Sequence, residues 1–279
     1  MKENKNRFKH SKSLGQNFLH DQNILRKICD LSDINQEETV VEIGPGQGAL
    51  TSHLIEKAKS VIAIEKDKRL IEFLTDKFKN NDNFEIINED VLKVDLTSFN
   101  DLKNLKLVSN LPYNITGPIL IRLFKNKTLF SKIVLTIQKE VGDKICSKKD
   151  TKSYGSLSII IQNYFEVKSN FKIPPTAFYP QPKVDSVVVS LKPLEKPRHF
   201  IKDEKIFETV TRQAFSTRRK TIKNSLENYF DKTLVFNALE NSSIDQKRRA
   251  ESLSIKEFAN LANSFYELVP PTSSISSLF

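Results

Sequence analysis

Two periods of hydrophobicity alternate along the first half of the chain. Short runs rich in β-branched residues, typical of buried strands, are separated at several places by segments in which apolar residues recur every three or four positions. Strands that alternate with helices predict an α/β fold, with a doubly wound, mostly parallel sheet covered on both faces. Such a sheet binds ligands at the carboxyl ends of its strands. The strand runs are TVVEIG (39–44), SVIAIE (60–65), FEIINED (84–90), LKLVSN (105–110) and KIVLTIQ (132–138), and the helical segments include ALTSHLIEKAK (49–59) and DKRLIEFLTDKF (67–78).

The pattern changes again in the second half of the chain. A helix-like run, YGSLSIIIQNYF (154–165), precedes two closing strands, and a charged, proline-containing linker follows at 192–199. Beyond the linker, residues 204–230 and 254–269 have helical periodicity and no β-branched runs. We therefore predict an α/β domain over 1–195, with a basic N-terminal arm and an early helix that Asp21 caps, and a small all-helical domain over 196–279.

The composition of the chain indicates which kinds of molecule it can bind. The chain carries 44 lysines and arginines against 34 acids, a net charge of +10, which favours polyanions: nucleic acid first and an anionic membrane surface second. Cys29 and Cys146 have no metal-binding or disulfide spacing, and the four histidines form no ligand cluster, so we expect no metal. The N-terminal residues include no apolar h-region, and no apolar run approaches the roughly 20 residues of a membrane span. We therefore expect a soluble, cytoplasmic protein.

Glycines and acids follow three successive predicted strands. Gly44, Gly46 and Gly48 stand between a strand and a helix, where a backbone turns sharply or approaches a ligand closely. The spacing also satisfies the dinucleotide fingerprint, so an NAD enzyme is one interpretation, and a ligand-free turn is another. Glu65 ends the second strand, where a carboxylate can hold both ribose hydroxyls, and Asp90 ends the third, within reach of an adenine amine. Together they predict a nucleoside pocket that suits S-adenosylmethionine as well as NAD.

The fourth strand ends in Asn110, Leu111, Pro112 and Tyr113. A proline here also serves simply to end a strand. The chemical interpretation is that an adenine amine is a poor nucleophile, because its lone pair is delocalised into the ring. The amide oxygen of Asn110 and the backbone carbonyl of Leu111 or Pro112 can accept hydrogen bonds from that amine and localise the pair. Tyr113 offers a stacking face for a base removed from its helix or loop.

These stretches resemble a known family. LGQNFL (14–19), EIGPGQGALT (42–51), NLPYNITGPIL (110–120) and IPPTAFYPQPKVDSVVVSL (173–191) are similar to motifs of the S-adenosylmethionine-dependent ribosomal RNA adenine N6-dimethyltransferases. The similarity covers nearly the whole chain and is strongest to the bacterial branch acting on small-subunit (16S) RNA. It implies a Rossmann-like class I methyltransferase sheet, with S-adenosylmethionine as the methyl donor.

The resemblance also implies roles for individual residues. Asn17, Leu19 and Gly44 would contact S-adenosylmethionine, Glu65 would hold its ribose and Asp90 its adenine amine. Asn110 would lie between cofactor and target base, and Leu111 and Pro112 belong to the same catalytic loop. Tyr113 and Phe178 would sandwich the target adenine. Two positions depart from the family pattern, Gly117 in the catalytic loop and Ser156 after the YG dipeptide, and neither removes a proposed chemical group.

Basic residues predict where RNA phosphates bind. Next to a nucleobase site, such residues position the RNA without reading its sequence. The resemblance implies two adjacent adenosines in a hairpin loop near the 3′ end of 16S rRNA, presented on an immature 30S subunit to a monomeric enzyme. The alternatives are a large-subunit (23S) methyltransferase of the macrolide-resistance branch, and an assembly factor whose binding matters more than its catalysis. The predicted RNA-binding residues are Lys9, Lys12, Arg212, Arg218, Arg219, Lys220 and Lys223.

Overall fold

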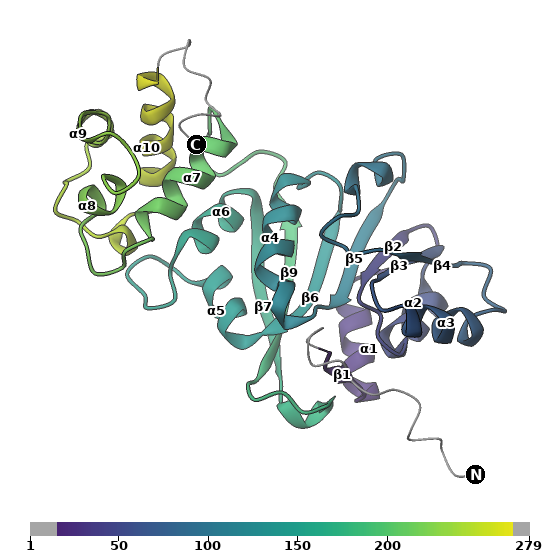
Figure 1. The fold of residues 1–279 in the computed structure, drawn as a ribbon. Coiled ribbons are helices and arrows are strands. Elements are labelled where there is room, and N and C mark those ends of the chain that lie inside the picture. Colours follow the sequence, from purple (N-terminus) through teal and green to yellow (C-terminus); the bar gives the residue numbers. More distant parts are fainter. Residues whose placement is uncertain (1–15, 270–279) are drawn as a thin grey trace. The chain divides into compact units, whose positions relative to one another are not determined.

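The computed structural model describes residues 16–269, and within that range the chain forms two compact units. The first unit consists of residues 16–142 and 168–193, and the second of residues 143–167 and 194–269 (Figure 1). Residues 143–167 therefore belong to the second unit, although they precede the linker at which the sequence predicts the boundary. The physical reason is packing, because Tyr164 of this segment meets Phe207 of the second unit with ring centroids 6.4 Å apart.

Seven strands within the described range form the main sheet, in the order β4-β3-β2-β5-β6-β9-β7. Figure 1 shows β2 to β6 side by side; they run parallel, whereas β9 is antiparallel to β6. All five predicted strand runs are confirmed. The strand order reverses between β2 and β5, which is the switch point where such sheets bind ligands. The bounds are β2 (Thr39–Ile43), β3 (Ser60–Glu65), β4 (Phe84–Asn88), β5 (Leu105–Asn110), β6 (Lys132–Gln138), β7 (Phe165–Ile173) and β9 (Ser186–Pro193).

Side chains that cap the helix N-terminus mark where helices in the first half of the chain begin. The Asp21 side chain accepts hydrogen bonds from the backbone amides of Asn23 and Ile24, at 2.9 and 3.1 Å, which confirms the predicted cap. Asp67 caps the third helix through Arg69 N. The helices after β5 and β6 were not predicted from the sequence. The bounds are α1 (Gln22–Leu31), α2 (Ala49–Lys57), α3 (Lys68–Lys77), η2 (Leu96–Phe99), η3 (Tyr113–Ile115), α4 (Thr116–Lys125) and α5 (Lys139–Cys146).

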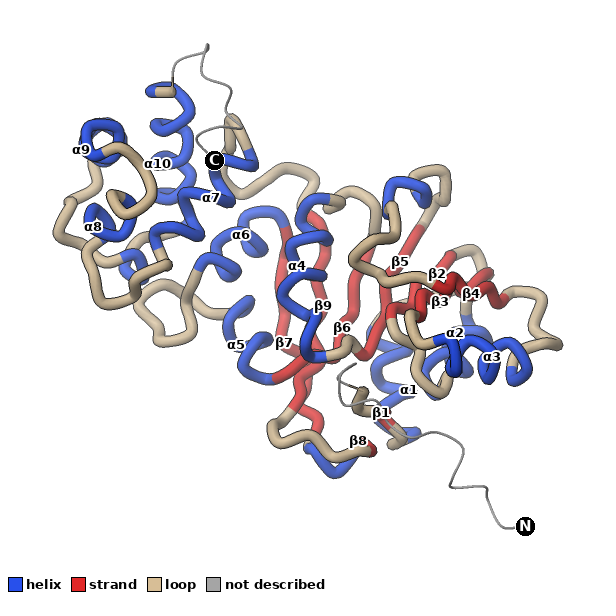
Figure 2. The backbone as a smooth tube through the Cα atoms, viewed as in Figure 1, coloured by secondary structure: helices blue, strands red, loops and turns tan. Residues whose placement is uncertain are grey.

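A two-stranded ribbon lies apart from the main sheet. Strand β1 (Phe18–Leu19) pairs antiparallel with β8 (Phe178–Tyr179), and Figure 2 shows the two short strands next to each other. The short helix η4 (Pro175–Ala177) leads into β8, and His20 N donates to Ala177 O at 3.1 Å. The inward residues Leu19 and Phe178 belong to the core that also contains residues of α1, α2 and α3. The pairing therefore anchors the segment that precedes α1 beside the first unit's core.

The second unit contains helices from residue 194 to the end of the described range, as the periodicity predicts. Its core is rich in aromatic rings, among them Phe215 stacked on Phe258 with centroids 5.7 Å apart. Ser254 and Glu257 form a capping box at the start of the last helix. No helix among residues 16–269 is long and apolar enough to cross a membrane. The bounds are α6 (Ser156–Tyr164), α7 (Glu204–Ala214), α8 (Ile222–Leu226), α9 (Lys232–Asn241), η5 (Ala250–Ser252) and α10 (Ile255–Leu268).

Candidate active site

The glycine loop between β2 and α2 has left-handed backbone conformations that favour glycine. Gly46 has φ +59° and Gly48 has φ +73°. A Cβ atom at Gly46 would lie 2.6 Å from the ring of Phe18, and one at Gly48 would lie 2.7 Å from the ring of Phe78. Lys77 Nζ donates to the carbonyls of Gln47 and Gly48, at 2.9 and 3.0 Å. The loop is thus shaped by glycine and held by a lysine that sequence reasoning missed.

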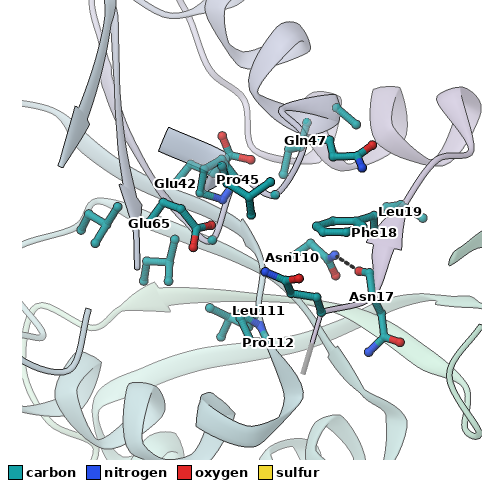
Figure 3. A pocket seen from close by; sticks show the side chains of 18 of the residues that line it. Asn17, Phe18, Leu19, Glu42, Pro45, Gln47, Glu65, Asn110, Leu111 and Pro112 are labelled. Carbon is teal, nitrogen blue, oxygen red and sulfur yellow. Dashed lines mark hydrogen bonds between the residues drawn. The ribbon is translucent and has the colours of Figure 1, made fainter. Parts of the chain in front are cut away.

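A cavity of about 230 Å³ opens at this loop, where β2, β3, β4 and β5 end (Figure 3). It brings together most of the residues predicted for the site, although they are spread along the chain from Asn17 to Tyr113. Phe178 does not line it. The predicted residues that do line it are Asn17, Leu19, Gly44, Glu65, Asp90, Asn110, Leu111, Pro112 and Tyr113.

Glu65 has a fixed orientation at the end of β3. Its Oε1 atom accepts hydrogen bonds from the backbone amides of Lys66 and Asp67, each at 2.8 Å. Burial raises the pKa of this carboxyl, while the two amides act in the opposite direction. A carboxylate held in this way lines the cavity and suits the ribose hydroxyls that we predict it to bind.

Asp90 lies one strand further along the same edge. Its Oδ1 atom accepts from Leu92 N at 3.0 Å, and its Oδ2 atom forms an ion pair with Lys66 Nζ at 2.9 Å. The hydrogen bond from Lys66 lowers the pKa of the carboxyl, so Asp90 is a constant acceptor near neutral pH. The Lys66 side chain is 60% exposed, and a solvated ion pair costs little to open for a ligand amine.

Asn110 presents a buried acceptor to the cavity. Its Nδ2 atom donates to the backbone carbonyl of Asn17 at 3.1 Å (Figure 3), and this bond determines which way the amide points. The Oδ1 atom is buried and has no hydrogen-bond partner among the described residues. An unsatisfied buried acceptor is unfavourable, and at this cavity a ligand that donates a hydrogen bond would satisfy it. An adenine amine is such a donor, and the site therefore fits the predicted substrate.

The rest of the catalytic loop is arranged around Asn110. The carbonyl of Pro112 already accepts from Ile115 N at 3.2 Å and from Thr116 Oγ1 at 3.3 Å. This leaves the carbonyl of Leu111 as the better candidate for a second acceptor. Tyr113 is half-buried and lines the cavity, with its hydroxyl 2.5 Å from Ser186 Oγ.

Phe178 lies in the core of the first unit and does not line the cavity. Its ring is 2% exposed and packs in the core with Leu19 and Ala177. The structure thus brings Tyr113, and not Phe178, to the cavity surface, and the sandwich of the target adenine between the two rings stays a prediction. A ring next to prolines is equally compatible with a core position, and the sequence alone does not distinguish the two.

The predicted RNA-binding residues are found in the second unit or outside the described range. Lys9 and Lys12 lie outside the described residues. Arg218, Arg219 and Lys220 are exposed in the turn between α7 and α8, where Arg218 donates to the backbone of Lys152. On the flanking helices, Arg212 and Lys223 are close to Glu208 and Glu227, at 3.6 and 3.8 Å.

The two departures from the family pattern lie at helix starts. Gly117 is the second residue of α4, and a Cβ atom there would meet nothing within 4 Å. Ser156 is the first residue of α6, directly after Gly155. Neither contributes to the cavity lining.

Glu42 is a further site residue that sequence reasoning missed. It lies in β2, is 1% exposed, lines the cavity and accepts a hydrogen bond from Thr51 Oγ1 at 2.6 Å. Burial raises the pKa of its carboxyl to about 8. The signal was present in the sequence, since an acid inside the apolar run TVVEIG is unusual for a buried strand.

Solved structures place this fold and site in a class. The structure is similar to a dimethyladenosine transferase from Plasmodium falciparum, with a TM-score of 0.75 and 27% identity over 90% of this chain and 98% of that one. The 23S rRNA methyltransferase ErmE shares the fold, with a TM-score of 0.64 and 24% identity over 90% of this chain and all of that one. The predicted fold class is confirmed: this is a class I S-adenosylmethionine-dependent methyltransferase.

The family follows from the sequence comparisons. Residues 7–267 match the family described as ribosomal RNA adenine dimethylase. The ribosomal RNA small subunit methyltransferase A of Clostridium botulinum is 45% identical over 95% of this chain and 98% of its own length. The protein of the same name from Clostridium acetobutylicum is 46% identical over 93% of this chain and 95% of its own length. The chain belongs to the ribosomal RNA adenine dimethylase family, and it is an enzyme that methylates rRNA with S-adenosylmethionine.

Proposed function

We propose that the protein dimethylates two adjacent adenosines in the 3′-terminal hairpin loop of 16S rRNA, at their N6 atoms, within immature 30S subunits. We further propose that it acts as a monomer in the cytoplasm, where subunits are assembled. Family membership and relatives at 45% identity that are named for the small subunit support this choice over the 23S branch. The observation that carries the chemistry is the buried, oriented Oδ1 atom of Asn110.

The chemical argument starts from the amine. S-Adenosylmethionine supplies an electrophilic methyl group, and the transfer requires chiefly proximity and a localised lone pair. Asn110 Oδ1 accepts a hydrogen bond from one amine N–H, and the carbonyl of Leu111 accepts one from the other. Each transfer forms the new carbon–nitrogen bond as the methyl–sulfur bond of the donor breaks, and the nitrogen releases one proton to solvent. Both acceptors are held by the fold before substrate binds, so they need no reorganisation as charge develops. Asn17 positions the Asn110 amide through the 3.1 Å hydrogen bond.

The substrate choice can be tested with labelled S-adenosylmethionine and purified subunits that lack the dimethyladenosines. We expect label in small subunits alone, as dimethyladenosine at two adjacent positions. Label in large subunits alone would contradict the proposal and favour the 23S branch.

Replacing Asn110 by alanine tests the chemistry. We expect Asn110→Ala to lower kcat by about 10²-fold or more, the effect of removing one preorganised polar group from a reaction site. Asn100→Ala, the same change at an exposed position outside the cavity, is the matched control and should leave kcat unchanged. If subunit binding survives in Asn110→Ala and the variant still supports subunit assembly, the assembly-factor interpretation gains support; an unchanged kcat would contradict the proposed role.

A further inference from the structure

The β1–β8 ribbon has two different faces. Its register pairs Leu19 with Phe178 and Phe18 with Tyr179, and cross-strand partners point to the same side of a ribbon. Leu19 and Phe178 are 4% and 2% exposed and belong to the core, and Leu19 also lines the cavity at the edge of that core. Phe18 and Tyr179 therefore share the opposite side.

That opposite side begins inside the reaction cavity and continues into solvent. The Phe18 ring lines the cavity and covers Gly46 (Figure 3). In an antiparallel pair the Cβ atoms of cross-strand partners are about 5 Å apart, so the Cβ atom of Tyr179 lies close to that of Phe18. Tyr179 is nevertheless 64% exposed and does not line the cavity. The ribbon is also connected to the catalytic loop, because the backbone carbonyl of Asn17, directly before β1, accepts a hydrogen bond from Asn110 Nδ2. Tyr179 is thus an aromatic residue at the rim of the cavity.

The ligand chemistry at this rim follows from the reaction. A target adenosine can reach Asn110 only when it leaves its stack, which also deprives the neighbouring base of a stacking partner. Aromatic side chains replace such lost stacking in proteins that bind unpaired nucleotides. An exposed ring alone would need no explanation. The ring of Tyr179 differs from other exposed rings because Tyr179 pairs with Phe18, which lines the cavity. Phe18 in turn directly follows Asn17, the residue that is hydrogen-bonded to Asn110.

We propose that Tyr179 stacks on the nucleobase adjacent to the target adenosine, outside the cavity. The inference rests on the proposed function and extends it, because it assigns a contact to a second nucleotide. For a substrate with two adjacent adenosines, this neighbour is the other adenosine for one target and the nucleotide that flanks the pair for the second. The contact recognises an unpaired base next to the target, in addition to the target itself.

Steady-state kinetics on unmethylated small subunits tests the contact. We expect Tyr179→Ala to raise KM for the subunit about tenfold, since stacking contributes roughly 5- to 150-fold per base, with kcat and the Kd of S-adenosylmethionine unchanged. Tyr179→Phe keeps the ring and should behave as the native protein, whereas Tyr179→Leu keeps apolar bulk without a ring and should resemble Tyr179→Ala. Val184→Ala, an exposed apolar residue in the same loop (46% exposed), is the matched control and should leave KM unchanged.

A crosslinking experiment gives a direct readout. With unmethylated small subunits and no S-adenosylmethionine, benzoylphenylalanine at position 179 should crosslink to the nucleotide next to a target adenosine, mapped as a stop of reverse transcription that is absent without irradiation. An unchanged KM for Tyr179→Ala, a Leu variant as good as the Phe variant, or no crosslink at that nucleotide would each overturn the inference. Failure of the proposed function is distinguishable, because the native protein itself would then not methylate small subunits.

Discussion

At the scale of single residues, the site depends on polar groups in unusually buried positions. The amide nitrogen of Asn110 is satisfied by Asn17, and its amide oxygen is buried without a hydrogen-bond partner among the described residues. Glu42 is buried beneath the glycine loop with Thr51 as its hydrogen-bond donor. Lys77, which is exposed, holds the same loop through two carbonyls. Glu42 and the Asn110 oxygen give up contact with water, which the fold tolerates because Glu42 has a hydrogen-bond donor and the Asn110 oxygen belongs to a residue that lines a ligand cavity.

The buried carboxyl of Glu42 predicts a pH dependence of stability. Its pKa is about 8 in the folded protein and near 4.5 when exposed, so the folded state binds one more proton between these values. This group's stabilising contribution is complete below about pH 4.5 and is lost as the pH rises through about 8. We expect Glu42→Gln, which carries no titrating proton, to show a smaller fall in Tm than the native protein between about pH 5 and about pH 9.

The control for this prediction is Glu56→Gln, the same change at an exposed position of α2. It should reproduce the native fall in Tm. Thermal unfolding followed by circular dichroism across the pH range measures all three proteins. Parallel curves for the native protein and Glu42→Gln would show that Glu42 does not carry the pH dependence.

At the scale of elements, short turns at strand ends place the chemistry. The loop from Asn110 leads through η3 directly into α4, so the start of this helix supports the catalytic turn. Gly117 at that start has no contact that requires glycine, since a Cβ atom there would meet nothing within 4 Å. The departure from the family pattern is therefore compatible with an intact loop.

Gly117→Ala should stabilise the protein modestly. Glycine in a helix is less favourable than alanine by roughly 0.5–1 kcal/mol, so we expect the free energy of unfolding to rise by about that amount or less, with kcat unchanged. Gly142→Ala in α5 is the contrasting control, because its Cβ atom would overlap Val187 and should destabilise the protein. Urea denaturation measures both, and a destabilised or inactive Gly117→Ala would show that the catalytic loop needs the glycine.

At the scale of the whole molecule, the charge of the chain is distributed so that basic residues gather in particular segments. The net charge is +10, and the turn between α7 and α8 of the second unit presents the exposed Arg218, Arg219 and Lys220. Exposed cations of this kind exchange bound counterions for RNA phosphates on binding. The assignment of 196–279 as the RNA- or ribosome-binding domain, and of 1–195 as the methyltransferase domain, stays a prediction.

Removing two of these charges should change the salt dependence of binding. The logarithm of affinity falls with the logarithm of salt concentration by about one for each phosphate contact. We expect the double variant Arg219→Gln with Lys220→Gln to reduce this slope for small subunits by about 2, leaving the Kd of S-adenosylmethionine unchanged. Lys205→Gln with Lys232→Gln removes the same charge from other exposed positions of the second unit and serves as the control. Equal slopes for the two double variants would exclude a specific role for the turn.

The sequence by itself determined the local features of this protein. The five strand runs follow from short apolar stretches rich in β-branched residues, and the helices α1 to α3 and the helical second half follow from a period of about 3.6 residues. Both signals depend only on neighbouring positions. The alignment of the glycine loop, Glu65, Asp90 and Asn110 along one edge also follows, because parallel strands end on the same side of a sheet.

Only the tertiary structure decided the features that depend on contacts between distant segments. It assigned residues 143–167 to the second unit, formed the two-residue strands β1 and β8, and buried Phe178 rather than exposing it to the cavity. The bond from Asn110 to Asn17 joins residues 93 positions apart and decides which way the amide of Asn110 points. Such partners leave no periodic signal in the sequence, since hydrogen bonds and core packing across the fold are chosen by three-dimensional proximity and not by spacing along the chain.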